Sequence, residues 1–315
     1  MRIELLAGFL FLTGCTGNII LHAVYEAGPE PQIYFCPREN CSDIFRRLTL
    51  NVTTIDCALF DISSKTFLSI LKEKKARVFV DNKNAPKLTG LGLNLKMDQT
   101  DALSHNKFCV LDHEIVWTGS FNPTIEGERN TRNNVIIIHS NYLAANYEDE
   151  FNELWDSSGI RPVRYPMVYL NNQLYENYFC PEDCRLGVKE VIKLLGKANE
   201  SVYFMTYSFT DKEIADALIL AKNRGIDVSG VFEKSQESKY SQYQRLKGAG
   251  CKVRFDNKVG LMHHKVFIID RRIVITGSWN PTASGTEKND ENILIIHDAK
   301  VARQYLSEFY RLYGD

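Results

Sequence analysis

The feature that most constrains this chain is an internal repeat with a constant offset of 158 residues. Residues 105–139 align with residues 263–297 without a gap, and 16 of these 35 positions are identical. Two copies of one unit predict two similar halves in a single fold. The identical positions include His, Lys, Asp and Asn. A repeat kept only for packing would share mainly apolar and turn positions, so the repeat indicates a duplicated function as well.

Strand-like and helix-like segments alternate in both halves, which is typical of α/β proteins whose helices cover a largely buried sheet. We expect two similar α/β halves, residues 30–158 and 167–315, that face each other across a pseudo-twofold axis, with 159–166 as the connector. The expected strands are 54–60, 77–81, 107–111, 115–118, 135–139, 201–207, 226–232, 252–255, 266–269, 273–276 and 293–297. The expected helices are 63–75, 142–155, 211–224, 237–247 and 299–313.

Each half carries the pattern H-x-K-x4-D-x6-G-S-x-N. Residues i and i+2 of a strand face the same side, so His105 and Lys107 project together, as do His263 and Lys265. The Gly-Ser-x-Asn segment follows the next strand and forms a turn that supplies short hydrogen-bond donors. Two imidazoles, two ammonium groups and two Asn side chains suit a tetrahedral anion, with one imidazole attacking while the other protonates the leaving oxygen.

On these motifs the chain resembles the phospholipase D superfamily, whose signature is the duplicated His-Lys-Asp motif followed by Gly-Ser-x-Asn. The resemblance covers nearly the whole chain after about residue 33. It implies phospholipase D-like halves with the active site at their interface, and a phosphodiesterase that uses no metal or cofactor and forms a covalent phosphohistidine. One chain would suffice as a monomer, because it carries both motifs. By position, the catalytic residues would be His105 and His263, with Lys107, Lys265, Asn122 and Asn280 on the phosphate, Ser120 and Ser278 in support, and Asp112 and Asp270 structural.

Family members commonly hold the catalytic imidazole with an acidic or amide residue that follows Gly-Ser-x-Asn. The matching residue is Glu291 in the second half and Asn133 in the first. We expect each to hold the His of its own half, so Glu291 would hold His263 and Asn133 would hold His105. A carboxylate raises the pKa of an imidazole, whereas a neutral amide only fixes its tautomer. This predicts His105 as the neutral nucleophile and His263 as the protonated acid.

Eight Cys residues divide into three groups. Cys57, Cys109 and Cys251 lie in apolar, strand-like runs and are expected as inert buried thiols. Two Tyr-Phe-Cys-Pro clusters, 144 residues apart, contain the next four Cys. In an oxidising compartment they would form local disulfides, and the alternative is one zinc site of four thiolates. The disulfide candidates are Cys36 with Cys41 and Cys180 with Cys184.

The eighth Cys, Cys15, ends a short apolar run near the N-terminus. The Leu-Thr-Gly-Cys ending of residues 12–15 resembles a prokaryotic lipoprotein signal, in which the Cys carries lipid. The rivals are an uncleaved anchor helix, which would interrupt its apolar residues at 13–18, and a buried N-terminal segment. We expect residues 1–24 to be a leader or anchor, and the protein to be extracytoplasmic and held at a membrane.

Composition narrows the substrate only slightly. The chain is 44% hydrophobic and 24% charged with a net charge of −1, which excludes a disordered chain and shows no global basic field. Residues 159–315 carry 23 basic and 19 acidic residues, a small positive excess that could receive a polyanion. Within the phospholipase D superfamily the chain looks most like the small nuclease, Zucchini-type branch, and that resemblance implies an endonuclease that favours single strands. The alternatives are a phospholipase D or phosphatidyl transferase, and a surface binding protein without catalysis.

Overall fold

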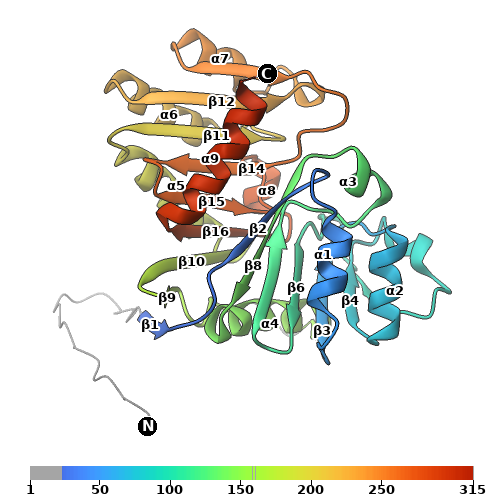
Figure 1. Ribbon diagram of the computed structural model, residues 1–315. Helices are drawn as coiled ribbons and strands as arrows, with labels where there is room; N and C mark the ends of the chain where they lie inside the picture. Colours follow the sequence, from blue (N-terminus) through green and yellow to red (C-terminus); the bar gives the residue numbers. More distant parts are fainter. Residues whose placement is uncertain (1–22, 158, 160, 315) are drawn as a thin grey trace.

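The computed structural model of the chain describes residues 23–157, 159 and 161–314. It confirms the predicted α/β architecture, with one mixed sheet in each half (Figure 1). The strand orders are β2-β8-β7-β6-β3-β4-β5 in the first half and β1-β9-β10-β16-β15-β14-β11-β12-β13 in the second.

The element bounds follow the repeat. The first half contains β2 (Gln32–Cys36), α1 (Cys41–Leu48), β3 (Ile55–Leu59), α2 (Lys65–Glu73), β4 (Arg77–Val80), η1 (Ala85–Leu88), β5 (Asn94–Met97), β6 (Lys107–Leu111), β7 (Ile115–Gly119), α3 (Ile125–Arg129), β8 (Asn133–His139) and α4 (Asn141–Asp156). The second half contains β1 (Ala23–Glu26), β9 (Met167–Leu170), β10 (Gln173–Cys180), α5 (Cys184–Gly196), β11 (Ser201–Thr206), α6 (Lys212–Asn223), β12 (Asp227–Glu233), η2 (Lys234–Gln236), α7 (Tyr243–Gly248), β13 (Lys252–Asp256), β14 (Lys265–Ile269), β15 (Ile273–Gly277), α8 (Ala283–Glu287), β16 (Glu291–His297) and α9 (Ala299–Tyr313).

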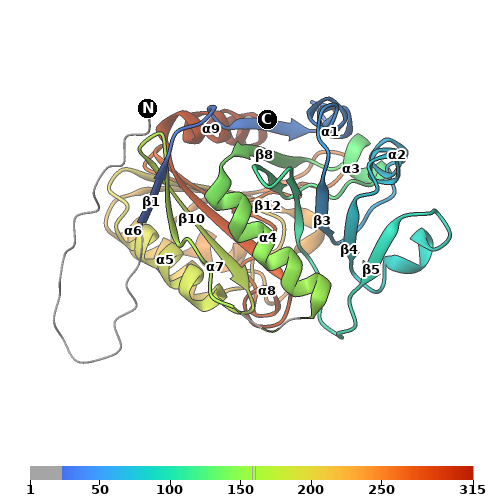
Figure 2. The ribbon, with the colours of Figure 1, turned by 90° about the horizontal axis from the view of Figure 1, so that it is seen from below.

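The helices separate into outer and inner layers. Helices α1 and α2 pack on the outer face of the first sheet, and α5 and α6 pack on the outer face of the second. Helices α4 and α9 bury their apolar faces in one inner core that contains side chains from both sheets. Figure 2 shows α4 between β3 of the first half and β10 of the second, where the rings of Tyr147 and Phe179 meet at 5.0 Å. The two halves therefore share a core.

Several segments differ from expectation. Helices α1, α3, α5 and α8 and strands β2, β5, β9 and β10 were not predicted from the sequence. Ala23 and Val24, which the sequence assigned to the leader, belong to β1, which pairs in parallel with β9 at the edge of the second sheet. Tyr25 stacks on Tyr169 there, with ring centroids 4.8 Å apart. The helix expected over 237–247 is only α7, because side chains of Ser238 and Ser241 bind backbone amides and form turns before it. Cys15 and the rest of the expected leader lie outside the described residues.

The Cys pairing partly confirms and partly corrects the sequence analysis. Disulfides join Cys36 to Cys41 and Cys180 to Cys184 in place of a zinc site. Cys251 is a buried free thiol. The expectation for Cys57 and Cys109 was wrong, because they form a third disulfide. They are directly opposite each other on β3 and β6, with Cα atoms 4.1 Å apart, and this register could not be read from either strand alone.

The interface between the halves has two pseudo-equivalent sides, and one of them is rich in ion pairs. Arg132 of the first half pairs with the buried Asp256 of the second. Buried Glu308 of α9 pairs with Arg311, with N and O atoms 2.7 Å apart, and with Arg38 of the Cys36 loop at 3.6 Å. Three guanidinium groups thus neutralise two buried carboxylates on this side.

The repeat places acidic residues at the equivalent positions of the other side. Asp290, Glu153 and Glu182 stand where Arg132, Arg311 and Arg38 stand on the first side, while Asp98 and Glu150 take the places of Asp256 and Glu308. Burial, with help from Asp98 and Glu182, raises the pKa of Asp290 to about 8. Burial together with Glu182 and Asp290 holds the pKa of Glu150 well above its ordinary value. On this side, protonated Asp290 and Glu150 therefore take the places of residues that form ion pairs on the first side.

This asymmetry predicts how stability depends on pH. A raised carboxylate pKa gives stability that is complete below the unfolded pKa of about 3.9 and is lost as the pH rises toward the folded pKa. Asp290→Asn, which cannot ionise, should therefore raise the unfolding temperature by several degrees at about pH 9 and change it little at about pH 5. Thermal unfolding followed by circular dichroism across this range measures the difference.

Asp256→Asn is the matched control, because it leaves the Arg132 guanidinium without its partner. It should lower the unfolding temperature at every pH in the range. Equal unfolding temperatures for wild type and Asp290→Asn at alkaline pH would contradict the ionisation of Asp290.

Candidate active site

A cavity of about 460 Å³ lies between the halves and is lined by the His residues of both His-x-Lys motifs. His105 precedes β6 and His263 precedes β14, and both residues are largely buried at the cavity wall. The two imidazoles that the repeat predicted on one site therefore share one cavity. The lining consists of Phe60, Asp61, Leu103, His105, Asn122, Thr124, Glu126, Gly127, Thr131, Asn133, Tyr207, Ser208, Gln236, Leu261, His263, Asn280 and Thr282.

Each imidazole is held by a residue of the other half, which corrects the expected pairing. His105 Nδ1 lies 2.8 Å from both carboxylate oxygens of Glu291. His263 Nδ1 lies 2.9 Å from Asn133 Oδ1 and 3.0 Å from the backbone oxygen of Ser120. In both pairs the Nδ1–H can donate to the oxygen, which leaves Nε2 free for chemistry.

The exchange follows from how the two repeats dock. The backbone N–H of His105 donates to the carbonyl of Asp290 at 2.9 Å, and that of His263 donates to the carbonyl of Arg132 at 2.8 Å. These reciprocal bonds set the segment before β16 against the segment before β6, and the segment before β8 against the segment before β14. The residue after each bridge, Glu291 or Asn133, therefore reaches the imidazole of the opposite half.

The two Lys side chains are buried and hydrogen-bond to the backbone of the His residues. Lys107 Nζ donates to the carbonyl of His105 at 2.6 Å, and Lys265 Nζ donates to that of His263 at 2.9 Å. Burial lowers the pKa of Lys107 to about 7, and burial with the Lys107 charge holds the pKa of Lys265 well below its ordinary value. A bound anion would restore the charge of both ammonium groups, because it supplies the opposite charge that the cavity lacks.

The same two effects act on the imidazoles. Burial and the ammonium groups of Lys107 and Lys265 hold the pKa of His105 and of His263 well below the usual value. Burial likewise raises the pKa of Glu291 to about 8. The free site therefore favours neutral imidazoles, and a phosphate anion in the cavity would favour protonation of the one that serves as the acid.

The Asn and Ser residues of the motif take different places. Asn122 and Asn280 line the cavity, and their buried amide oxygens have no hydrogen-bond partner in the described part of the chain. Ser120 lies behind the cavity, where its hydroxyl accepts from the backbone N–H of Asn134 at 3.0 Å. Ser278 accepts from the backbone N–H of Asn292 at 2.9 Å. The amides can face a ligand, whereas the hydroxyls hold the strands that carry Asn133 and Glu291.

The Asp residues of the motif hold turns away from the cavity. Asp112 accepts from the backbone N–H groups of Thr53 and Thr54, at 2.9 Å and 2.7 Å. Asp270 makes the equivalent bonds to the backbone before β11. Both turns fix the start of a strand next to a His-x-Lys strand, so a structural role fits these residues.

Two aromatic residues of the site were missed by the sequence analysis. The Phe60 ring stands edge-on to the His105 ring with centroids 4.9 Å apart, and Tyr207 stands likewise on His263 at 4.7 Å. Lys107 Nζ lies 5.2 Å from the Phe60 centroid and Lys265 Nζ 5.0 Å from that of Tyr207. A cation over a ring is stabilised when it is desolvated. The available signal was their shared position, at the end of the first expected strand of each half (54–60 and 201–207).

Three further observations concern metal binding, membrane crossing and the remaining His of the second motif. Within residues 23–157, 159 and 161–314, no cluster of three or more His, Cys, Asp or Glu side chains has an arrangement that could hold a metal ion. Across the same ranges, the longest apolar helices fall short of what a bilayer crossing requires. His264 lies buried between Asn134 and Glu308, outside the cavity.

Comparison with known proteins gives three findings. The family described as "Cardiolipin synthase, PLD-like domain" matches residues 51–155 and 191–313. A protein named phospholipase D from Rickettsia prowazekii (strain Madrid E) is 38% identical over 123 residues, 39% of this chain and 60% of that protein. The mitochondrial cardiolipin hydrolase of Xenopus tropicalis is 33% identical over 158 residues, 50% of this chain and 71% of that protein. The first of these matches thus spans about 60% of the relative's length.

A solved structure extends the comparison to the whole fold. Phosphatidylserine synthase from Haemophilus influenzae Rd KW20 has a TM-score of 0.67 against this chain, with 14% identity, and covers 90% of this chain and 86% of its own. At that identity the likeness concerns the fold alone. It places both halves of the chain in one known arrangement.

The exchanged partners predict distinct titrations of the two imidazoles. In wild type, both should titrate below about pH 6.5, because burial and the Lys charges lower each pKa. Asn133→Asp should raise the pKa of His263 by about one unit or more and leave that of His105 nearly unchanged. NMR spectra of protein labelled at the His Cε1 carbons, assigned with single His variants, report both values.

Glu291→Gln is the reciprocal variant and should act on His105 alone. If Asn133→Asp instead moved the titration of His105, each residue would hold the imidazole of its own half.

Proposed function

The chain belongs to the phospholipase D superfamily, and from that membership we propose that it is a phosphodiesterase that hydrolyses phospholipids through a covalent phosphohistidine without a metal. The observation that carries the proposal is the single cavity lined by two oriented imidazoles, His105 and His263, each of whose backbone carbonyls accepts from a buried Lys ammonium group. The proposed reaction needs one nucleophile, one proton donor and cations for the non-bridging oxygens, and these groups provide all three.

In the first step His105 Nε2 attacks phosphorus and the bond from phosphorus to the leaving oxygen breaks. His263 gives its Nε2 proton to that oxygen, so the alcohol leaves neutral and His105 carries the phosphoryl group. In the second step the now neutral His263 takes a proton from water, which attacks phosphorus and releases His105. Lys107, Lys265, Asn122 and Asn280 would bind the non-bridging oxygens throughout.

The assignment of His105 as nucleophile now has a different basis. From the sequence we expected the nucleophile to be the imidazole held by the neutral amide. Because Asn133 holds His263 in the structure, that criterion alone would select His263. We retain His105, because its ring becomes cationic when the N–P bond forms, and that positive charge favours the ionised form of Glu291, whose carboxyl group lies 2.8 Å from His105 Nδ1. The neutral Asn133 stabilises the imidazolium of His263 less, which favours transfer of its proton.

The cavity lining supports a lipid as the substrate. Leu103, Leu261 and Phe60 give it an apolar part, and Asp61 and Glu126 place carboxylates at the wall. The described lining adds no Lys or Arg to the two buried ammonium groups. A polyanion is bound by cations along its length, whereas a phospholipid presents one phosphodiester beside apolar groups. The names of the relatives, phospholipase D and cardiolipin hydrolase, agree with this choice.

A nuclease is the second candidate, and one segment favours it. Gln236 lines the cavity and is followed by Lys239 and Tyr240, which is 65% exposed. Lys239 Nζ lies 5.0 Å from the Tyr240 ring centroid. An exposed aromatic ring next to a cation is a means of stacking bases of a single strand.

Substrate assays decide between the two candidates. Purified protein should release headgroup from phosphatidylglycerol or cardiolipin vesicles and should leave single-stranded DNA and RNA intact, with equal rates with and without EDTA. His105→Ala and His263→Ala should each abolish turnover. Cleavage of the oligonucleotides without lipid hydrolysis would favour the nuclease, and loss of activity in EDTA would contradict the mechanism.

A substrate with a good leaving group identifies the nucleophile. A p-nitrophenyl phosphodiester needs little protonation of its leaving oxygen, so His263→Ala should still release a burst of about one nitrophenol per enzyme. His105→Ala should show no burst. Mass spectrometry of the quenched His263→Ala protein should find the phosphoryl group on the His105 peptide, and a burst from His105→Ala would reverse the assignment.

A further inference from the structure

Two of the three disulfides end opposite the two residues that hold the imidazoles. Cys36, the last residue of β2, is the register partner of Asn133, the first residue of β8. Cys180, the last residue of β10, is the register partner of Glu291, the first residue of β16. Residues directly opposite each other in an antiparallel pair share one face of the sheet, with Cβ atoms about 4.5–5.5 Å apart. Each disulfide therefore lies against one orienting residue.

The strand that bears the Cys is the neighbour whose register extends as far as each orienting residue. The ladder between β7 and β8 ends at Val135, two residues beyond Asn133. The ladder between β15 and β16 likewise ends at Ile293, two residues beyond Glu291. Among the strand registers of the described residues, the one with β2 or β10 extends to the orienting residue. The last residue of the Cys strand therefore helps to place that residue, together with the bridge between the halves that precedes it and the Ser hydroxyl that holds the residue after it.

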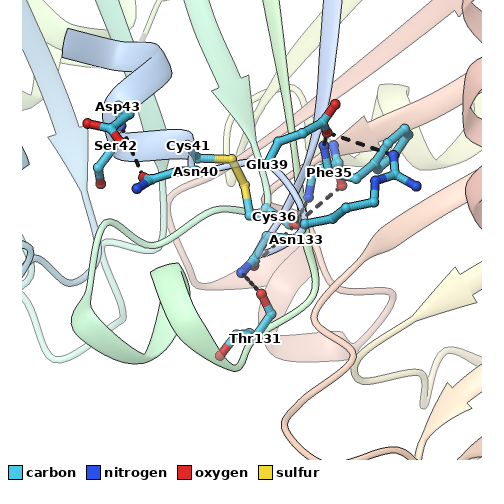
Figure 3. Close-up of a disulfide and its surroundings, with 12 residues drawn as sticks. Phe35, Cys36, Glu39, Asn40, Cys41, Ser42, Asp43, Thr131 and Asn133 are labelled. Atoms are coloured by element: carbon cyan, nitrogen blue, oxygen red, sulfur yellow. Dashed lines mark hydrogen bonds and ion pairs between the residues drawn. A yellow bond between two sulfur atoms is a disulfide. The ribbon is translucent and has the colours of Figure 1, made fainter.

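Each disulfide ties that last strand residue to the outer helix layer. Cys41 and Cys184 are the first residues of α1 and α5, and all four sulfur-bearing residues are at most 2% exposed. Figure 3 shows the Cys36–Cys41 bond beside Asn133, whose Nδ2 donates to the carbonyl of Thr131 at 2.9 Å. Without the bond, this strand end would be held to the helix by the four-residue loop 37–40 and by the hydrogen bonds between Phe35 and Glu39 within that turn. Strand ends without such a tie open at low free-energy cost.

We propose that these two disulfides position the catalytic histidines, so that the enzyme works fully only in its oxidised form. Cys36–Cys41 acts on His263 through Asn133, and Cys180–Cys184 acts on His105 through Glu291. That these His residues are catalytic rests on the proposed function, whereas the contacts from each disulfide through its orienting residue to the imidazole do not. Reduction by a dithiol transfers two electrons and two protons to each bond, gives two thiols, and oxidises the dithiol to its own disulfide.

The third disulfide provides an internal control. Cys57–Cys109 joins β3 to β6 within the ladder, and neither residue pairs with β8 or β16. Its loss should lower the unfolding temperature and leave the orientation of both imidazoles unchanged. The comparison separates a general loss of stability from a specific loss of position.

The test compares three double variants, Cys36→Ala/Cys41→Ala, Cys180→Ala/Cys184→Ala and Cys57→Ala/Cys109→Ala. ¹⁵N spectra of the His side chains report the fraction of each ring that carries its proton on Nδ1. The first variant should lower this fraction for His263 only and the second for His105 only, and the third should change neither. Since the spectra need no substrate, this result is independent of the proposed reaction.

Activity and a second mutation complete the test. On whichever phosphodiester the wild type cleaves, the first two variants should lower kcat by about 10²-fold and change KM little, because a displaced catalytic group costs roughly that much. Removing Cys36–Cys41 in an Asn133→Ala background should cause no further loss at His263. Equal changes at both imidazoles from either variant, or folded variants with unchanged spectra, would overturn the proposal.

Reduction of the native protein replaces any variant that fails to fold. Stepwise treatment with dithiothreitol, followed by alkylation and peptide mass spectrometry, shows which bond has opened at each step. Tautomer fractions and activity should fall with the opening of the Cys36 and Cys180 bonds. If both persist after these bonds have opened, the disulfides do not position the imidazoles.

Discussion

The site depends on an exchange across the interface, in which each half supplies an imidazole and the residue that orients the imidazole of the other half. Glu291 holds His105 and Asn133 holds His263, through contacts of 2.8–2.9 Å. Reciprocal backbone bonds from His105 to Asp290 and from His263 to Arg132 place these residues. Neither half could therefore present a correctly oriented imidazole by itself, and the shared inner core serves the chemistry as well as stability.

Burial of the catalytic groups costs free energy, because it removes their charges from water, and it also prepares the site to bind an anion. Two ammonium groups and two imidazoles are almost fully removed from water, and their charged forms are disfavoured by desolvation. Rings of Phe60 and Tyr207 and the carbonyls of His105 and His263 offset part of this cost. A phosphodiester would supply the missing negative charge, so binding and activation of the site would occur together.

The two halves differ in charge at equivalent positions of their interface. One side keeps arginines against Asp256 and Glu308, whereas the other has acids against Asp98 and Glu150. Asn133 and Glu291 differ in the same way, although they occupy equivalent positions. A duplicated fold with such differences can give its two histidines unequal roles, since the neighbours of each ring set its charge.

The sequence by itself determined the repeat, the α/β class, the His-Lys pairs and the Asn residues of the motif, because local spacing decides these. It favoured the two short disulfides over a zinc site without deciding between them. It predicted a helix over 237–247, of which only α7 forms, and it assigned Ala23 and Val24 of β1 to the leader. At these two places turns and edge pairing outweigh the local sequence pattern. Only the tertiary structure decided that Glu291 reaches His105, that Cys57 joins Cys109, and that Phe60 and Tyr207 frame the site. These contacts arise from strand register and from the docking of the halves, and periodicity within one segment carries no information about either.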